Sequence, residues 1–185
     1  MGEPGTKEIL SLDELEAAGN LRTGRKHVLA ILVENKPGVL TRIAGLFARR
    51  GFNIDTLAVG PTDDPNVSRV TLTLDGAVHP MDQVTKQLHK LVNVLKIRDL
   101  EPEETLAREL ALFKVAADGA ARAEVMQIVE IFRAKVVDVT KRSVVAEVTG
   151  THEKIEAFER LVRPFGLIEM ARTGEIAIAR GRSET

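Results

Sequence analysis

The chain has 185 residues with 26 basic and 27 acidic side chains, and its net charge of -1 offers no field that would attract nucleic acid. It has no cysteine, which excludes disulfides, a thiolate nucleophile and a zinc-ribbon site, and suits a reducing, cytoplasmic compartment. No apolar run is long enough to cross a membrane, and the length allows one large or two small domains.

Residues 1–26 are expected to form an N-terminal extension that is largely disordered. The segment combines Gly and Pro with a short amphipathic piece built on Leu10, Leu12 and Leu15. Five acidic residues argue against a secretory or organelle-targeting signal: Glu3, Glu8, Asp13, Glu14 and Glu16. No function can be read from this extension.

The next stretch predicts a strand, a helix and a second strand. The apolar run His27–Glu34 is typical of a strand that is buried on at least one side. It stops at Asn35–Gly38, where a cap-type side chain, a proline and a glycine favour the start of a helix. The second strand is expected over Phe52–Gly60. The inward face of the helix is expected to consist of Leu40, Ile43, Ala44 and Phe47, spaced i, i+3, i+4 and i+7.

The turn into this helix is a candidate ligand site. The first turn of a helix has backbone N–H groups without partners and a partial positive charge, so a small carboxylate fits there. Gly38 would let a ligand approach the backbone, and the amides of Asn35 and Asn53 can both donate and accept. We therefore expect a small zwitterion in this turn. The alternative is that Asn35 only caps the helix and Gly38 only relieves the turn.

Residues 61–100 predict a hairpin, a second helix and a fourth strand. The segment Pro61–Asn66 is rich in turn formers. The following strand alternates Val70, Leu72 and Leu74 with Thr71, Thr73 and Asp75, so one face is expected to be exposed to water. A helix opens at Pro80, with an apolar face of Met81, Val84, Leu88 and Leu91, and a strand follows over Val94–Leu100. The order β-α-β-β-α-β predicts a ferredoxin-like α+β fold with both helices on one face of an antiparallel sheet.

The same order repeats in the second half, after a polar joint at residues 101–107. Strands are expected at Leu110–Ala116, at Val136–Thr140, at Val144–Thr149 and within Gly166–Arg180, where Thr173 and Gly174 form a turn. Helices are expected over Ala120–Arg133 and after Thr151, with inward residues Val125, Ile128, Val129, Phe132, Ile155, Phe158, Leu161 and Val162. Ile43 and Phe47 correspond to Ile128 and Phe132, which supports two copies of one unit. The second copy lacks the Asn-x-x-Gly pattern, so ligand is expected only in the first.

The sequence gives little support for a catalytic or an RNA-binding function. The histidines at 27, 79, 89 and 152 are scattered, and Asp63-Asp64 is explained by its hairpin loop as well as by a Mg²⁺ site. No P-loop or G-x-S-x-G motif is present. An RNA-binding sheet needs exposed aromatic rings, whereas the central strands offer only Phe113 with Thr71 and Thr73. An amino-acid sensor or an interaction subunit remains, with a sheet whose free edges favour pairing of two copies.

Several separate stretches resemble the small regulatory subunit of acetolactate synthase (acetohydroxyacid synthase). They are LVENKPGVLTRIAGLFARRGFNIDTLAVGPTDDPNVSRVTL, TKQLHKLVNVLKI, RELALFKV, IFRAKVVDVT and the closing IAIARG, in the order and spacing of that family from about His27 to Gly181. The resemblance implies an N-terminal ACT domain that binds a branched-chain amino acid, chiefly valine, at a dimer interface. It also implies a non-catalytic chain that activates a catalytic subunit carrying thiamine diphosphate, Mg²⁺ and FAD.

Carried over to this chain, the resemblance implies an effector site with no catalytic residue and no metal. Asn35 and Gly38, with the backbone at Val39 and Leu40, would bind the charged end of the effector. Asn53 and Ile54 would reach it from the facing protomer.

The implied domains are the extension at 1–26, an ACT domain at 27–101, a linker at 102–108, a C-terminal ferredoxin-like domain at 109–181 and a tail at 182–185. Two other readings stay open. One is a stand-alone ACT-type sensor that regulates a different enzyme, and the other is an independent enzyme.

Overall fold

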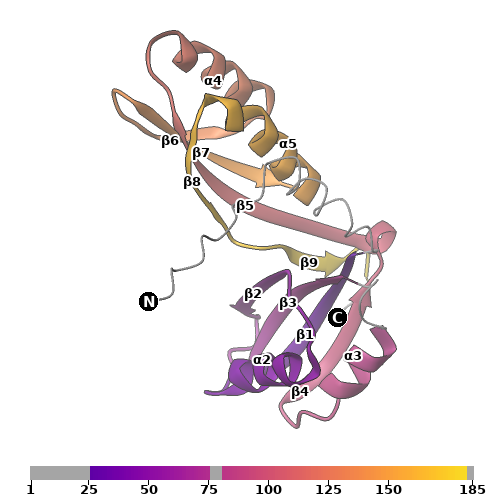
Figure 1. Ribbon diagram of the computed structural model, residues 1–185. Helices are drawn as coiled ribbons and strands as arrows, with labels where there is room; N and C mark the ends of the chain where they lie inside the picture. The colour runs from indigo at the N-terminus through magenta and orange to yellow at the C-terminus, as the bar shows by residue number, and fades with distance from the viewer. Residues whose placement is uncertain (1–25, 76–80, 183–185) are drawn as a thin grey trace, which may run out of the picture.

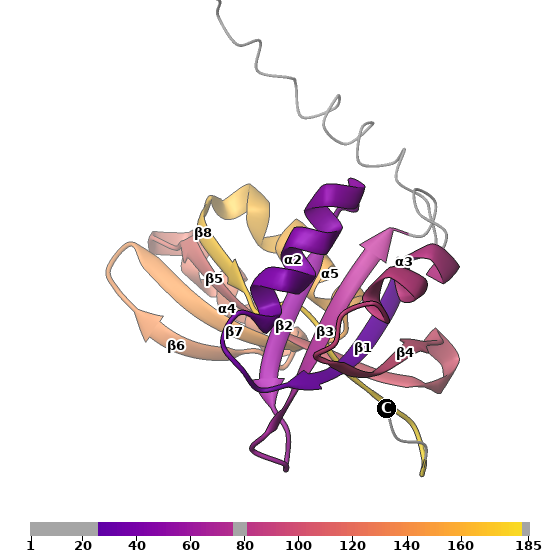
Figure 2. The same ribbon diagram turned by 90° about the horizontal axis from the view of Figure 1, so that it is seen from below.

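The computed structural model describes residues 26–75 and 81–182, and the expected N-terminal extension lies outside this range. The first unit consists of β1 (Lys26–Glu34), α2 (Val39–Arg50), β2 (Thr56–Pro61), β3 (Val67–Asp75), α3 (Met81–Leu88) and β4 (Val94–Leu100). Its antiparallel sheet has the order β2-β3-β1-β4. Both helices cover one face of this sheet, as Figure 2 shows, which confirms the predicted ferredoxin-like arrangement.

The second unit repeats this plan with one strand added. It consists of a 3-10 turn (Pro102–Glu104), β5 (Thr105–Ala116), α4 (Gly119–Ile131), β6 (Lys135–Val139), β7 (Ser143–Gly150), α5 (His152–Val162), a 3-10 turn (Arg163–Phe165), β8 (Leu167–Arg172) and β9 (Ile176–Ala179). The sheet order is β6-β7-β5-β8, and β9 pairs with β5 alone. Figure 1 shows α4 and α5 on the side of this sheet remote from the first unit.

Two helix faces differ from the predicted ones. In α2 the buried residues are Val39, Ile43, Leu46 and Phe47, whereas Leu40 and Ala44 are exposed. In α5 Leu161 is exposed as well. Because α2 has apolar residues at 39, 40, 43, 44, 46 and 47, its sequence is compatible with two neighbouring stripes. The structure buries the stripe that contains the bulkier Leu46, and the predicted inward positions of Leu40 and Ala44 were wrong.

β5 begins at Thr105, inside the stretch that was expected to be a linker. Residues 102–104 form the 3-10 turn, and Thr105–Arg108 pair with β9 from Ala179 back to Ile176. From Glu109 onward the same strand pairs with β7, and from Ala111 with β8. The partner of Thr105–Arg108 lies some seventy residues later in the chain, so local patterning could not show that this segment is a strand.

The open face of the first sheet is covered by β9. Ala177 and Ala179 form a buried cluster with Ala30 and Leu100, and Figure 1 shows β9 against the face opposite α2 and α3. As a result Thr71 and Thr73 are only 2% and 3% exposed. The expectation that this face of β3 is wet was therefore wrong. Phe113 also points away from any open surface, because it packs in the second core against Phe158.

Candidate functional site

The turn into α2 presents an open helix terminus. Gly38 is the N-cap residue with φ 83°, a left-handed conformation that favours glycine, and a Cβ at this position would have no heavy atom within 4 Å. The Val39 N–H donates to the Lys36 carbonyl oxygen at 3.4 Å, and the first turn contains no acidic residue. Val39 is buried and anchors the turn, while Leu40 is exposed. The Val39 amide is therefore engaged within the turn, and the next amides of the first turn, those of the exposed Leu40 and Thr41, lie at the positive end of the helix.

Asn35 has a different local role from the one that a helix cap would have. Its backbone N–H donates to the Asn66 carbonyl oxygen at 2.7 Å, and its side-chain Nδ2 donates to the Pro65 carbonyl oxygen at 3.0 Å. Both bonds hold the loop against the hairpin between β2 and β3. The alternative that Asn35 only caps α2 is thus wrong. Among the described residues nothing donates to Asn35 Oδ1, so this oxygen is an exposed acceptor beside the turn.

A polar chain next to the turn fixes its position. Glu34 accepts hydrogen bonds from Lys36 at 3.0 Å and from the side chain of Asn93, and Asn93 in turn accepts from Arg42 at 2.6 Å. The Asn93 hydrogen bond, followed by Lys36, lowers the pKa of Glu34 below its ordinary value. Glu34 is therefore ionised at neutral pH and connects the end of β1 with the turn before β4.

Asn53 and Ile54 lie beyond the opposite end of α2. Asn53 Nδ2 donates to Asp55 Oδ1 at 3.1 Å, and Ile54 packs partly against the first core. The 12 residues of α2 span about 18 Å, so one chain does not bring these two residues to Gly38. The structure thus places Asn35, Gly38, Val39 and Leu40 together at one end of α2 and leaves Asn53 and Ile54 at the other.

The edge of the first sheet carries exposed apolar side chains, Leu57 and Val59 on β2. They are paired in register with the buried Leu72 and Val70, so they point toward the helix side of the sheet. Leu40 is exposed on α2, the helix that covers this side. We call Leu40, Leu57 and Val59 the β2 edge patch. An unpaired edge strand beside exposed apolar side chains is suited to association with a second chain.

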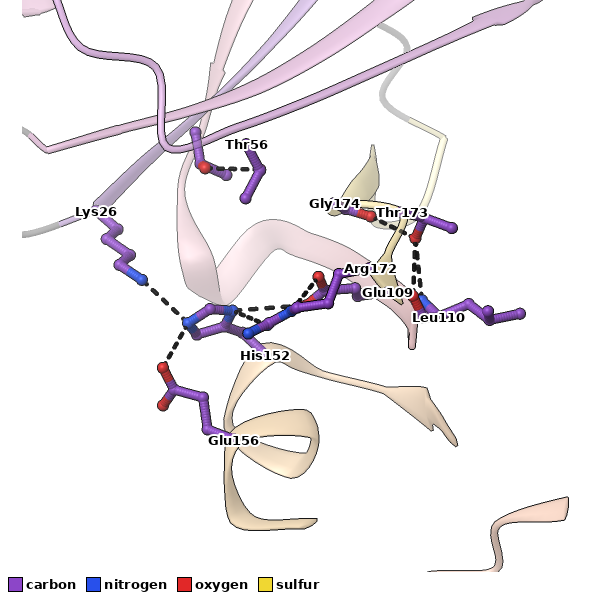
Figure 3. A network of polar contacts seen from close by, with 10 residues as sticks. Lys26, Thr56, Glu109, Leu110, His152, Glu156, Arg172, Thr173 and Gly174 are labelled. Atoms are coloured by element: carbon purple, nitrogen blue, oxygen red, sulfur yellow. Dashed lines mark hydrogen bonds and ion pairs between the residues drawn. The ribbon is translucent and has the colours of Figure 1, made fainter. Parts of the chain in front are cut away.

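A cavity of about 730 Å³ lies between the two units, and Asn53 and Ile54 belong to its lining. Its other side holds a polar network that sequence reasoning missed (Figure 3). Arg172 donates from Nε and Nη2 to the two carboxylate oxygens of Glu109, at 2.8 and 2.6 Å. Nη2 also lies 3.0 Å from His152 Nδ1. The other ring nitrogen, Nε2, lies 2.9 Å from a carboxylate oxygen of Glu156.

The charge state of this network follows from its geometry. Glu109 is 1% exposed. Burial raises the pKa of Glu109, but the hydrogen bonds and charge of Arg172, together with His152, outweigh burial and leave the pKa below its ordinary value. The hydrogen bond to Glu109 also raises the pKa of Arg172. The pair is ionised, and Lys26 Nζ, 3.0 Å from His152 Nε2, brings β1 of the first unit to the same network.

The arrangement of the titratable groups offers little chemistry of its own. In residues 26–75 and 81–182 no three His, Cys, Asp or Glu side chains come together as metal ligands would. Asp64 Oδ1 accepts from the backbone and side chain of Asn66, which accounts for this residue as part of a turn. His27 pairs with Asp99 at 3.0 Å.

Among the described helices none is long and apolar enough to span a membrane.

Comparison with known proteins gives the same family for both halves. Residues 29–96 match a family described as the AHAS small subunit-like ACT domain, and residues 108–181 match one described as the small subunit of acetolactate synthase. The chain is 49% identical over 155 residues to the acetolactate synthase small subunit of Mycolicibacterium smegmatis, covering 84% of this chain and 91% of that protein. It is also 49% identical over 156 residues to a probable acetolactate synthase small subunit of Methanothermobacter thermautotrophicus, covering 84% and 93%.

A solved structure resembles the whole described fold. The crystal structure of an acetolactate synthase small subunit from Thermotoga maritima superimposes with a TM-score of 0.79 at 42% identity. The match covers 86% of this chain and 99% of that chain. The similarity therefore extends over both units and is not limited to the first.

Proposed function

The chain belongs to the acetolactate synthase small-subunit family, and we propose that it raises the activity of the catalytic large subunit and confers feedback inhibition by valine. It is the non-catalytic, regulatory partner of the pair. Thiamine diphosphate, Mg²⁺ and FAD would be held by the catalytic subunit and not by this chain. The family match disfavours a stand-alone sensor of another enzyme. A cytoplasmic location stays a prediction.

The observation that carries the proposal is the open terminus of α2 at Gly38. Its amides and the positive end of the helix suit the carboxylate of an amino acid, and the left-handed glycine leaves the space for that carboxylate. Asn35 Oδ1 lies beside the turn and could accept from the ammonium group of the same ligand. These features support a zwitterion as effector, with the exposed Leu40 beside its aliphatic end.

The second half of the site would come from a second copy of the chain. Asn53 and Ile54 lie near the far end of α2, so a two-fold axis at the β2 edge would bring them toward the Gly38 turn of the partner. The β2 edge patch supplies apolar surface at that place. Valine, leucine and isoleucine would bury three or four aliphatic carbons there, worth roughly 2 to 3 kcal/mol, which gives a modest affinity suited to feedback.

Inhibition requires that valine prefer one state of the complex. A ligand that binds two states with equal affinity does not shift the equilibrium between them. Because the proposed site is shared between two chains, valine would stabilise one arrangement of the paired ACT domains over the other. The catalytic subunit would then be activated by one arrangement and left less active by the other.

The test compares two substitutions at one position, Gly38→Asn and Gly38→Asp. Asn and Asp tolerate the left-handed backbone about equally, so both variants carry a similar strain of about 1 kcal/mol and differ in charge. We expect Gly38→Asp to raise the valine concentration needed for inhibition at least about 100-fold, because a carboxylate would face that of the effector. Gly38→Asn is expected to keep most of the inhibition, and both variants are expected to keep activation.

The measurements are inhibition of the reconstituted complex and the heat of titrating the purified chain with valine, leucine and isoleucine. Asn53→Ala, which removes an amide of the other half-site, is also expected to lose valine inhibition. If the Gly38→Asp complex is inhibited as strongly as wild type, the site is elsewhere. If the wild-type chain does not activate a catalytic large subunit, the proposed function itself fails.

A further inference from the structure

A small two-stranded ribbon, formed by β9 and residues 105–108 of β5, has its large and small side chains on unexpected faces. Ala177 and Ala179 point toward the first sheet and are buried. Ile176 and Ile178 alternate with them and are 62% and 52% exposed, and Leu106 on β5 is exposed beside Ile178. A ribbon that served only to cover the first sheet would turn its larger residues inward. Their exposure to water is unfavourable in free energy, and a bound partner would remove that exposure.

An apolar groove of about 510 Å³ runs along this ribbon. Ile176, Ile178 and Leu106 form one wall, and Ala58, Gly60 and Thr71 of the first unit lie opposite. The lining takes in Ala58 and Gly60 on the face of β2 that β9 covers and also Val59 of the β2 edge patch, so the groove reaches the β2 edge and adjoins that patch. A partner in the groove would touch the same strand that is proposed to form the dimer.

The charged residues of the groove lining are two arginines, Arg69 and Arg108. Arg69 donates to the Ala177 carbonyl oxygen at 3.3 Å and so protects the free edge of β9. Arg108 is exposed, and its hydrogen bond goes to the neighbouring Ala107 carbonyl oxygen. No carboxylate among the described residues pairs with Arg108. The groove is therefore apolar with a cationic rim.

We propose that this groove binds an apolar segment of the catalytic large subunit that carries a carboxylate opposite Arg108. The proposal rests on the proposed function, because family membership is what implies a catalytic partner. A segment with aliphatic side chains would cover Ile176, Ile178 and Leu106, and its carboxylate would complement the rim. A second copy of the chain fits less well, because two grooves facing each other would bring arginines against arginines.

The experiment measures the dissociation constant between the full chain and its catalytic subunit for single variants. Ile178→Asp places a charge in the apolar wall, and we expect the dissociation constant to rise at least about 30-fold. The matched control is Ile131→Asp at the end of α4, where the side chain is 76% exposed and remote from the groove, and it is expected to stay within about twofold. Arg108→Glu is expected to weaken binding about tenfold, with the loss reduced at high salt.

Three further readouts separate this surface from the other sites. The melting temperature, the sedimentation coefficient and the heat of valine binding are expected to be unchanged in Ile178→Asp. Wild-type affinity for the catalytic subunit in Ile178→Asp would overturn the inference, and so would a loss of self-association without a loss of catalytic-subunit binding. If the wild-type chain does not bind the catalytic subunit, the proposed function fails together with the inference.

Discussion

At the scale of single residues, the chain departs from simple patterning at two places. Gly38 adopts the left-handed backbone that frees the start of α2, and Glu109 places a carboxylate in a row of inward positions with Ala111, Phe113 and Val115. A charged residue in phase with core residues was a visible signal of a buried ion pair. Its partner Arg172 lies 63 residues away, so the sequence alone did not identify it.

Substitution Glu109→Gln tests how much this pair, which joins β5 to β8, stabilises the second unit. Removal of the buried carboxylate leaves Arg172 without its charged partner, and we expect a loss of about 2 kcal/mol in the free energy of unfolding at pH 7. The control Glu156→Gln removes a more exposed acceptor of His152 and is expected to cost less than about 0.5 kcal/mol. Urea denaturation of both variants measures the difference.

The pH dependence of that loss has a defined sign. Because the pKa of Glu109 is lowered in the folded state, its stabilisation is present above the ordinary value near 4.5 and is lost as the pH falls through the lower, folded value. The difference between wild type and Glu109→Gln should therefore shrink in this acidic window. A constant difference from pH 7 to pH 3 would show that the carboxylate acts by packing and not by charge.

At the scale of elements, regular periodicity predicted most helices and strands, and long-range contacts decided the rest. The order β-α-β-β-α-β followed from alternating apolar residues and from turn formers such as Pro37 and Gly38. The exposed position of Leu40, the early start of β5 at Thr105 and the burial of Thr71 all depend on contacts between distant segments. For the effector site, the assignment of Asn35, Gly38, Asn53 and Ile54 stays a prediction, and the cavity between the units and the ribbon of β9 were not predicted from the sequence.

The packing of β9 on the first sheet can be tested with Ala177→Leu. Ala177 is buried against Ala30 and Leu100, so three added carbons would push the ribbon away and cost about 1 to 3 kcal/mol. The matched control is Ala171→Leu on β8, where the alanine is exposed and the change is expected to be nearly neutral. Hydrogen exchange of the amides in residues 176–179 should accelerate in the first variant alone. Unchanged exchange would mean that β9 tolerates a larger side chain at this contact.

At the scale of the whole molecule, the two edges of the first sheet differ in what surrounds them. β2 is the edge strand next to the two halves of the proposed effector site, and β4 is the opposite edge strand. Both carry exposed aliphatic residues, Leu57 on β2 and Leu95 on β4. If two chains pair through β2, self-association and valine binding depend on the β2 edge and not on the β4 edge.

Leu57→Asp and Leu95→Asp separate these edges. We expect Leu57→Asp to weaken self-association more than about tenfold and to remove the heat of valine binding, because both half-sites need two chains. Leu95→Asp is expected to leave both unchanged. Analytical ultracentrifugation and calorimetry measure the two properties, with melting temperatures to confirm folding. Self-association that is lost in Leu95→Asp and retained in Leu57→Asp would place the dimer on the β4 edge.

β5 contributes both to the second sheet and to the ribbon whose β9 strand covers the first sheet, and this constrains how its length can vary. β5 pairs with β9 through Thr105–Arg108 and with β7 from Glu109 onward. Side chains alternate along a strand, so inserting one residue between Arg108 and Glu109 would reverse the facing of one end relative to the other. Either the alanines of the ribbon would then face solvent, or Phe113 would leave the core of the second unit. Insertions and deletions at this point should be tolerated only in pairs.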